Sequence, residues 1–240
     1  MSAPEESSSS TVPTIAQYVP ALIVVDMQHD FVYGSLQVPG GASIIDPVNK
    51  LIDMPFTMRV ATRDYHPDNH VSFAKTHQKS EFSKETIFHP EDSTKSLGVE
   101  QTLWPVHCVA NTDGANFVTG LETSKFDAIM HKGTHPHIES YSAFRDIWCK
   151  GTTELPGLLN AQGVTDLYFV GLAGDYCVKY TALDAMDFGY NTWVIRDGIR
   201  SISDDDVAEK ALLAKGVRFT TMQEVEKRLV AKVEADKERS

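Results

Sequence analysis

Leu167-Tyr-Phe-Val-Gly-Leu-Ala-Gly-Asp-Tyr-Cys-Val178 joins a short apolar run to the start of an amphipathic segment. The run Leu167–Val170 is rich in β-branched and aromatic residues, which favours a buried β-strand. From Asp175 to Phe188, apolar residues recur at the spacing of one helix face, and Asp175 is the expected N-cap. A strand that leads directly into a helix predicts an α/β fold, with Cys177 in the first helical turn.

Cys177 is therefore a candidate nucleophile. A thiol in the first turn of a helix feels the positive end of the helix macrodipole, which favours the thiolate. The free backbone N–H groups of the same turn could hold a developing oxyanion. The alternative is a buried cysteine that packs as a small apolar side chain. The local sequence is compatible with both interpretations.

Strand and helix patterns alternate on both sides of this unit. The apolar run Pro20–Val25 is typical of a strand buried on both faces of a parallel sheet. The expected strands are 20–25, 56–62, 126–130, 167–170, 192–195 and 217–220, and the expected helices are 43–53, 145–149, 154–161, 175–188, 203–216 and 224–237. This alternation predicts a three-layer α/β/α fold around a doubly wound, mostly parallel, six-stranded sheet. Residues 67–125 lack regular periodicity, and a loop of that length is usually functional.

The composition limits the classes of function. The chain has 240 residues, 42% of them hydrophobic, which is enough for one sizeable core. We expect one domain over residues 18–240, after a disordered serine-rich tail at residues 1–17. The net charge of −11 argues against nucleic acid or an anionic membrane as a partner, and no apolar run reaches membrane-spanning length. Three cysteines and a start unlike a secretory signal indicate a reduced, cytoplasmic protein, with access to the nucleus left open.

Five chemically useful side chains fall at the carboxyl ends of expected strands. They are Asp26, Asp64, His66, Lys132 and Cys177. In doubly wound sheets, ligands bind beyond the carboxyl ends of the strands. We therefore expect these five side chains to meet at one edge of the sheet.

Asp26, Lys132 and Cys177 form a coherent catalytic set. Asp26 could take the thiol proton as a general base, and Lys132 would help to keep the carboxylate and the thiolate ionised. Each residue also has an ordinary structural interpretation. An aspartate at the end of a buried strand can be a helix cap or an ion-pair partner, and a lysine can extend from a sheet edge into solvent.

Asp64, His66 and His107 are candidate metal ligands. Residues two apart on a strand face the same side, so Asp64 and His66 can chelate one ion together. One carboxylate and two imidazoles suit a single divalent metal with open positions, and zinc, iron and manganese are all compatible. Asp-x-His is a weak spacing signal, and His70 or His77 could equally supply a ligand.

The two remaining cysteines are interpreted as structural. Cys108 follows His107 directly, and adjacent side chains on an extended chain point in opposite directions. Cys149 falls in the expected helix 145–149, where we interpret it as a buried helix residue.

Seven short motifs follow one another along the chain: Asp26-Met-Gln28, Asp64-Tyr-His66-Pro67, Asn69-His-Val-Ser-Phe73, Trp104-Pro-Val-His107-Cys108, Lys132-Gly133, Ser140-Tyr-Ser-Ala-Phe144 and Gly171-Leu-Ala-x-Asp-x-Cys177-Val178. Their joint order and spacing resemble the nicotinamidase/pyrazinamidase family of the isochorismatase-like cysteine hydrolases. The metal motif and the Trp-Pro-x-His segment separate this family from metal-free relatives. Gly174 is a departure, because many members have threonine there, and it puts the rigidity of this loop in question.

The resemblance implies roles for the candidate residues. It implies a catalytic triad of Asp26, Lys132 and Cys177. It implies one divalent metal held by Asp64, His66 and His107, with His70 as a further ligand in some members.

The resemblance also implies a substrate pocket. The N–H groups of Ala173 and Cys177 would form an oxyanion hole, beside a cis peptide bond between Leu172 and Ala173. The side chains expected to flank the substrate ring are Phe31, Trp104 and Tyr141.

The activity implied by this resemblance is hydrolysis of nicotinamide to nicotinate and ammonia through a cysteine thioester, in NAD salvage, with pyrazinamide as a second substrate. Two alternatives stay open: another cysteine hydrolase of the isochorismatase-like superfamily, and a non-catalytic metabolite-binding module. The absence of a Gly-x-Gly-x-x-Gly turn after the first strand argues against dinucleotide binding. A homo-oligomer is compatible with the sequence, which does not determine the oligomeric state.

Overall fold

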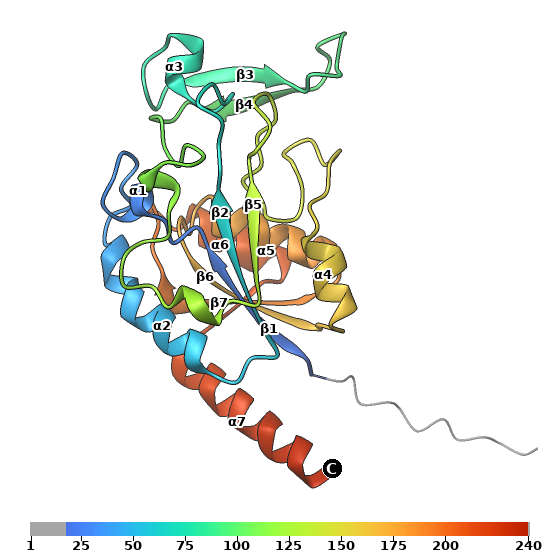
Figure 1. The fold of residues 1–240 in the computed structure, drawn as a ribbon. Coiled ribbons are helices and arrows are strands. Elements are labelled where there is room, and N and C mark those ends of the chain that lie inside the picture. Colours follow the sequence, from blue (N-terminus) through green and yellow to red (C-terminus); the bar gives the residue numbers. More distant parts are fainter. Residues whose placement is uncertain (1–17, 240) are drawn as a thin grey trace, which may run out of the picture.

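The computed structural model describes residues 18–239. The tail expected at residues 1–17 lies outside the described residues. A central parallel sheet lies between two layers of helices (Figure 1). Within residues 18–239, every helix is too short or too polar to cross a bilayer.

The sheet has six strands in the order β5-β2-β1-β6-β7-β8, and each neighbouring pair is parallel. The strands are β1 Pro20–Val25, β2 Met58–Asp64, β5 Ala128–Lys132, β6 Asp166–Gly171, β7 Asn191–Ile199 and β8 Arg218–Thr220. The chain runs outward from β1 on one side and from β6 on the other, which is the doubly wound pattern. The predicted six-stranded α/β/α fold is confirmed.

The helices cover both faces of the sheet. Helices α2 (Ile45–Asp53) and α7 (Met222–Arg239) pack on one face, and α4 (Leu155–Ala161), α5 (Cys177–Asp187) and α6 (Val207–Lys215) pack on the other (Figure 1). All six residues of β1 are buried, because alternate side chains enter the two different core clusters. This two-sided burial explains why β1 reads as one continuous apolar run.

The segment between β2 and β5 contains structure that the sequence pattern did not indicate. A two-stranded antiparallel sheet, β3 (Lys84–Phe88) and β4 (Gly98–Thr102), lies above the β2 and β5 ends of the main sheet (Figure 1). This segment also contains the short elements α3 Ala74–His77, η2 Asp113–Ala115 and η3 Thr123–Lys125. Two further short elements, α1 His29–Val32 and η1 Gly41–Ile44, lie between β1 and α2. Each strand of the small sheet buries only one of its five residues, so neither shows a strong apolar signal.

The predicted helix at 145–149 is wrong. The carboxylate of Asp146 accepts backbone N–H groups of Trp148, Lys150 and Gly151, which closes a loop in place of a helical turn. Cys149 lies in this loop with a φ of +57° and is exposed, so the prediction of a buried helix residue is also wrong. Cys108 is buried, as expected of a structural residue.

Candidate active site

Three predicted catalytic residues meet at the carboxyl edge of the sheet. The ammonium nitrogen of Lys132 lies 2.9 Å from Oδ2 of Asp26 and 3.3 Å from the sulfur of Cys177. It also contacts the carboxylate of Asp64. An Asp26 carboxylate oxygen lies within 4.8 Å of the Cys177 sulfur. All four side chains are buried, so their charges interact with little screening by water.

Each member of this cluster stands at the end or start of an element. Asp26 follows β1 directly with a φ of +46°, and Thr62 of β2 fixes its position. The Thr62 hydroxyl accepts the Asp26 N–H at 3.2 Å and donates to Asp26 Oδ1 at 2.5 Å. Lys132 is the last residue of β5, and Cys177 is the first residue of α5. The parallel topology therefore brings together side chains that are far apart in sequence.

Burial dominates the charge states of the acid and the thiol. It raises the pKa of Asp26 above its usual value, although the Lys132 ammonium opposes the change. Burial likewise raises the pKa of the Cys177 thiol, and Lys132 again opposes it. Burial acts to lower the pKa of Lys132, but the Asp26 and Asp64 carboxylates outweigh it and hold that pKa above its usual value.

These directions bear on one expectation from the sequence. We expected the helix N-terminus to favour the thiolate of Cys177, whereas burial raises the pKa of this thiol in the free protein. The thiol is therefore neutral at rest and needs a base within reach. Asp26, with a raised pKa, is better matched to accept that proton than an ordinary aspartate.

The turn before α5 differs from the sequence prediction in its cap. Tyr176 stands at the N-cap position, and Asp175 is not the cap. The Asp175 carboxylate instead accepts the N–H groups of Ile202 and Ser203, and this holds the segment after β7 against the turn.

Gly174, where the family often has threonine, is tied to the same segment. Its N–H donates to the Arg200 carbonyl at 2.7 Å. A Cβ at this position would lie 2.5 Å from the Ser201 hydroxyl oxygen, which is the mobile end of a side chain. The loop is therefore held by a backbone bond that does not depend on the missing side chain.

The peptide bond between Leu172 and Ala173 is cis, as the family resemblance implied. Among the hydrogen bonds within residues 18–239, none uses the N–H of Ala173 or of Cys177. Ala173 and Cys177 line the same small cavity. Two unpaired backbone donors beside a candidate nucleophile are the elements of an oxyanion hole.

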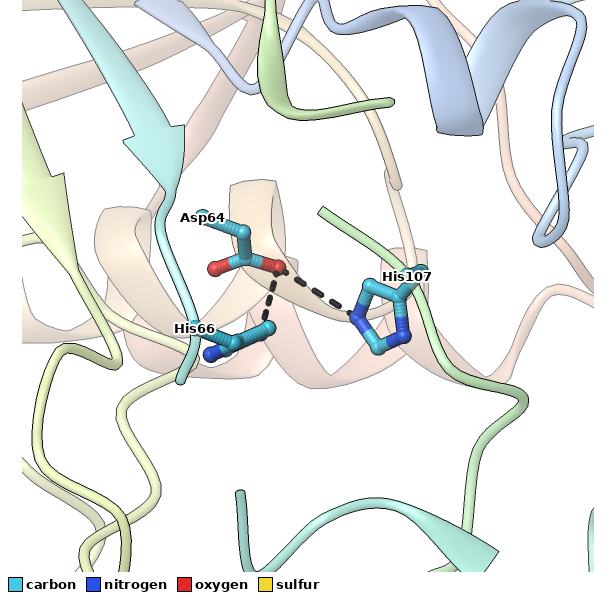
Figure 2. Close-up of side chains that lie close together, drawn as sticks. All are labelled: Asp64, His66 and His107. Atoms are coloured by element: carbon cyan, nitrogen blue, oxygen red, sulfur yellow. Dashed lines mark ion pairs between the residues drawn. The ribbon is translucent and has the colours of Figure 1, made fainter. Parts of the chain in front are cut away.

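The three candidate metal ligands also converge. Oδ2 of Asp64 lies 3.5 Å from Nε2 of His66 and 3.7 Å from Nε2 of His107 (Figure 2). Asp64 ends β2, His66 follows two residues later, and His107 comes from the separate segment after β4. All three side chains are buried, and their donor atoms lie within 4.8 Å of one another.

This arrangement fits a divalent metal with open coordination positions. Two ligands bound at about 2.1 Å in tetrahedral geometry are about 3.4 Å apart, close to the separations observed here. Nδ1 of His66 contacts the Gly133 carbonyl at 2.8 Å, and Nδ1 of His107 contacts the Pro105 carbonyl at 2.7 Å. Each Nδ1 must therefore carry the proton, which leaves Nε2 free as a ligand.

The charge on Asp64 also suits a metal ligand. Burial acts to raise its pKa, but opposing effects led by the Lys132 ammonium outweigh burial, so the pKa of Asp64 falls well below its usual value. The carboxylate is ionised, as binding of a cation requires.

The other two candidate histidines are directed elsewhere. Nδ1 of His70 contacts the Ser72 hydroxyl at 2.8 Å, and its Nε2 contacts the Ile138 carbonyl at 3.1 Å. Burial lowers the pKa of His70 to about 2, so its ring, which stacks on His66, is neutral. Nε2 of His77 contacts the Val71 carbonyl at 2.7 Å. Neither histidine joins the three-ligand group.

One cavity joins the two centres. Its lining consists of Phe31, Leu36, Asp64, His66, Trp104, His107, Glu139, Tyr141, Ala173, Tyr176, Cys177 and Ile202. The set contains the three aromatic residues expected to flank the substrate. The Tyr141 hydroxyl accepts Nε1–H of Trp104 at 3.0 Å and an amide N–H of Gln101 at 2.6 Å, which fixes the two rings relative to each other.

Glu139 is a site residue that sequence reasoning missed. It is buried on the cavity wall, where it accepts the Ser140 N–H at 2.8 Å and an amide N–H of Gln101 at 3.3 Å. Burial raises its pKa above the usual value. A single glutamate in an irregular loop has no periodic pattern around it, and its adjacency to the Ser140-Tyr-Ser motif was the one available signal.

Comparisons with known proteins show which family the chain belongs to. Residues 20–226 match the family model of the isochorismatase domain. The chain is 43% identical to the nicotinamidase of Saccharomyces cerevisiae over 196 residues, covering 77% of this chain and 89% of the relative. The structure of the yeast nicotinamidase bound to the inhibitor nicotinaldehyde superposes with a TM-score of 0.79 at 39% identity, covering 84% of this chain and 99% of the other. The pyrazinamidase of Pyrococcus horikoshii in complex with zinc superposes with a TM-score of 0.67 at 36% identity, covering 85% and 99%. The chain therefore belongs to the isochorismatase-domain family and, within it, to the nicotinamidases.

Proposed function

We propose that this protein hydrolyses nicotinamide to nicotinate and ammonia by nucleophilic catalysis at Cys177. The observation that carries the proposal is the position of the Cys177 sulfur, which shares a buried cluster with Asp26 and Lys132 and faces the cavity that contains the metal ligands. The similarity to nicotinamidases over most of the chain supports the same substrate.

In the first half of the reaction, Asp26 takes the thiol proton and the sulfur attacks the carboxamide carbon. The carbonyl oxygen gains the negative charge and accepts hydrogen bonds from the N–H groups of Ala173 and Cys177. One such donor is worth about 3 kcal/mol of the barrier. Protonated Asp26 then gives its proton to the departing nitrogen. The C–N bond breaks, ammonia leaves, and the acyl group remains on sulfur as a thioester.

In the second half, a water molecule replaces ammonia. Asp26 accepts a proton from the water, the oxygen attacks the thioester carbon, and the same two N–H groups hold the oxyanion. The C–S bond breaks, Asp26 returns its proton to the departing sulfur, and the product loses its carboxyl proton to solvent and leaves as nicotinate. Lys132 stays protonated throughout and compensates the negative charge that moves between Asp26 and the sulfur.

Asp64, His66 and His107 would hold one divalent ion, and zinc is the first candidate because of the ligand types and the zinc-bound pyrazinamidase relative. When bound, the ion supplies a Lewis acid that orients the substrate. Phe31, Trp104 and Tyr141 are proposed to enclose the substrate ring. Iron and manganese remain alternatives.

The proposal also covers the extent of the domain, the cellular role of the enzyme and its partners. Residues 18–240 form one catalytic domain. The enzyme acts in NAD salvage in the cytoplasm, accepts pyrazinamide as a second substrate, and has no nucleic-acid or membrane partner. The net charge of −11 supports the last point.

The direct test is ammonia release from nicotinamide by the purified full-length protein, before and after chelator treatment. We expect turnover that falls on chelation and returns when zinc is added. Activity that survives complete metal removal would contradict the role of the metal. No release of ammonia from nicotinamide or pyrazinamide by metal-loaded protein would favour a different hydrolase or a binding module.

A further inference from the structure

The segment directly after Asp26 contacts the backbone around two of the three metal ligands. Gln28 is fully buried, and its side-chain amide makes three hydrogen bonds to backbone groups. Its Oε1 accepts the Asp64 N–H at 2.8 Å, and its Nε2 donates to the Asp64 carbonyl at 2.7 Å and to the Ala115 carbonyl at 2.9 Å. Both backbone groups of one metal ligand therefore depend on one side chain.

The Gln28 side chain supplies hydrogen bonds to the end of β2, beyond the last backbone pair between β1 and β2. The register between β1 and β2 ends at Val24 and Ala61. The Gln28 amide pairs with the N–H and the C=O of Asp64, as a peptide group of a neighbouring strand would. A carboxamide can donate and accept in this way, whereas a carboxylate lacks the donors and a leucine lacks both. Asp64 is thereby fixed relative to Asp26, two residues before Gln28.

Asp30 makes the corresponding contact on the other side of the metal centre. Its Oδ2 accepts the N–H of Cys108, the residue after His107, at 2.8 Å. The carboxylate fits closely between two glycines, because a Cβ at Gly34 or Gly114 would lie 2.2 or 2.1 Å from an Asp30 oxygen. The bond from the Cys108 N–H to Asp30 holds the backbone directly after His107. Cys108 has a φ of +46° at this point.

We propose that Gln28 and Asp30 are positioning residues that hold Asp64 and His107 at the separation a metal ion requires, and at a fixed distance from Asp26. The inference rests on the proposed metal centre. Outer contacts that orient ligands typically change metal affinity by about 10- to 100-fold when removed. A residue that only stabilises the fold would lower the unfolding temperature without changing the affinity or the ligand geometry of the folded protein.

The test measures metal binding by the full-length apo-protein, independently of activity. Zn²⁺ affinity is determined by competition with a chromophoric chelator, and ligand geometry by the visible spectrum of bound Co²⁺. We expect Gln28→Leu and Asp30→Ala each to bind Zn²⁺ about 10- to 100-fold more weakly than wild type, with an altered Co²⁺ spectrum. Gln37→Leu is the matched control, because exposed Gln37 also donates a side-chain bond to a backbone carbonyl, that of Val32, but lies outside the metal centre. It should bind both ions as wild type does.

Asp30→Asn provides a rescue, because it keeps an oxygen that can accept the Cys108 N–H. It should recover most of the affinity lost in Asp30→Ala, and this pair carries the test if Gln28→Leu does not fold. Wild-type Zn²⁺ affinity and a wild-type Co²⁺ spectrum in folded Gln28→Leu and Asp30→Ala would overturn the inference while leaving the proposed function intact. Failure of the wild-type protein to bind either ion would overturn the metal centre itself, and with it this inference.

Discussion

The ammonium group of Lys132 lies 3.3 Å from the sulfur of Cys177 and contacts the carboxylates of both Asp26 and Asp64. An ammonium has three N–H donors, and this one has three ionisable neighbours. One lysine thus links the thiol centre to the metal ligands. The roles of these residues can be separated by substitution.

Cys177→Ala should abolish ammonia release from nicotinamide, because no other described thiol is close enough to the cavity to replace it. We expect turnover to fall by about 10³-fold or more, as when other covalent nucleophiles are removed. Metal content should stay at the wild-type level, since Asp64, His66 and His107 supply the proposed ligands and the sulfur is not one of them. Cys149→Ala, which removes an exposed thiol, is the control and should be fully active. Substantial turnover by Cys177→Ala would rule out the thioester route.

Lys132→Met should destabilise the protein as well as inactivate it. The substitution leaves the Asp26 and Asp64 carboxylates buried without their cation, and removing one partner of a buried ion pair costs about 3–5 kcal/mol. Lys125→Met is the matched control, because Lys125 pairs with Asp53 on the surface, where such a pair contributes about 0–1 kcal/mol. Urea unfolding of both variants and the wild type, all free of metal, gives the comparison. Equal stability of the two variants would show that Lys132 is not compensating buried charge.

The sheet and its edge could be predicted because their signals are local. Strands such as Pro20–Val25 and Leu167–Val170 are buried on both faces and therefore read as uninterrupted apolar runs. In a parallel sheet the carboxyl ends of such strands meet at one edge, so Asp26, Lys132 and Cys177 could be expected together before any distance was known.

The features that were not predicted depend on contacts between distant segments. Asp175 has the residue type of an N-cap, but its carboxylate bonds the backbone at Ile202 and Ser203 instead. Glu139 gains its place on the cavity wall from the fold of an irregular loop. The thiol of Cys177 is governed by desolvation, which neighbouring residues in the sequence do not reveal. In each case tertiary surroundings outweigh the local preference of the residue type.

His107→Ala should lose the metal, whereas His70→Ala should keep it. Nε2 of His107 lies 3.7 Å from Oδ2 of Asp64, but both ring nitrogens of His70 contact other groups. Metal content of the purified variants, measured by mass spectrometry, separates the two cases. We expect His107→Ala to raise the KM for nicotinamide as well, because the metal orients the substrate. A loss of metal in folded His70→Ala would place that ring among the ligands.

Gly133→Ala should disrupt the metal centre from outside the ligand set. A Cβ on Gly133 would lie 2.4 Å from Cε1 and 2.5 Å from Nδ1 of His66, closer than any real contact. The His66 ring must then rotate or move, and it would lose the bond from Nδ1 to the Gly133 carbonyl that leaves Nε2 free for the metal.

Backbone strain alone would also destabilise such a variant, since Gly133 has a φ of +62°. Gly163→Ala separates the two effects, because Gly163 has nearly the same φ, +63°, and no atom lies within 4 Å of the position of its Cβ. Both variants should lose about 1 kcal/mol of unfolding free energy to the strained backbone. Only Gly133→Ala should also bind Zn²⁺ about tenfold or more weakly, with loss of activity. Equal Zn²⁺ affinity in the two folded variants would mean that His66 does not need the Gly133 carbonyl to act as a ligand.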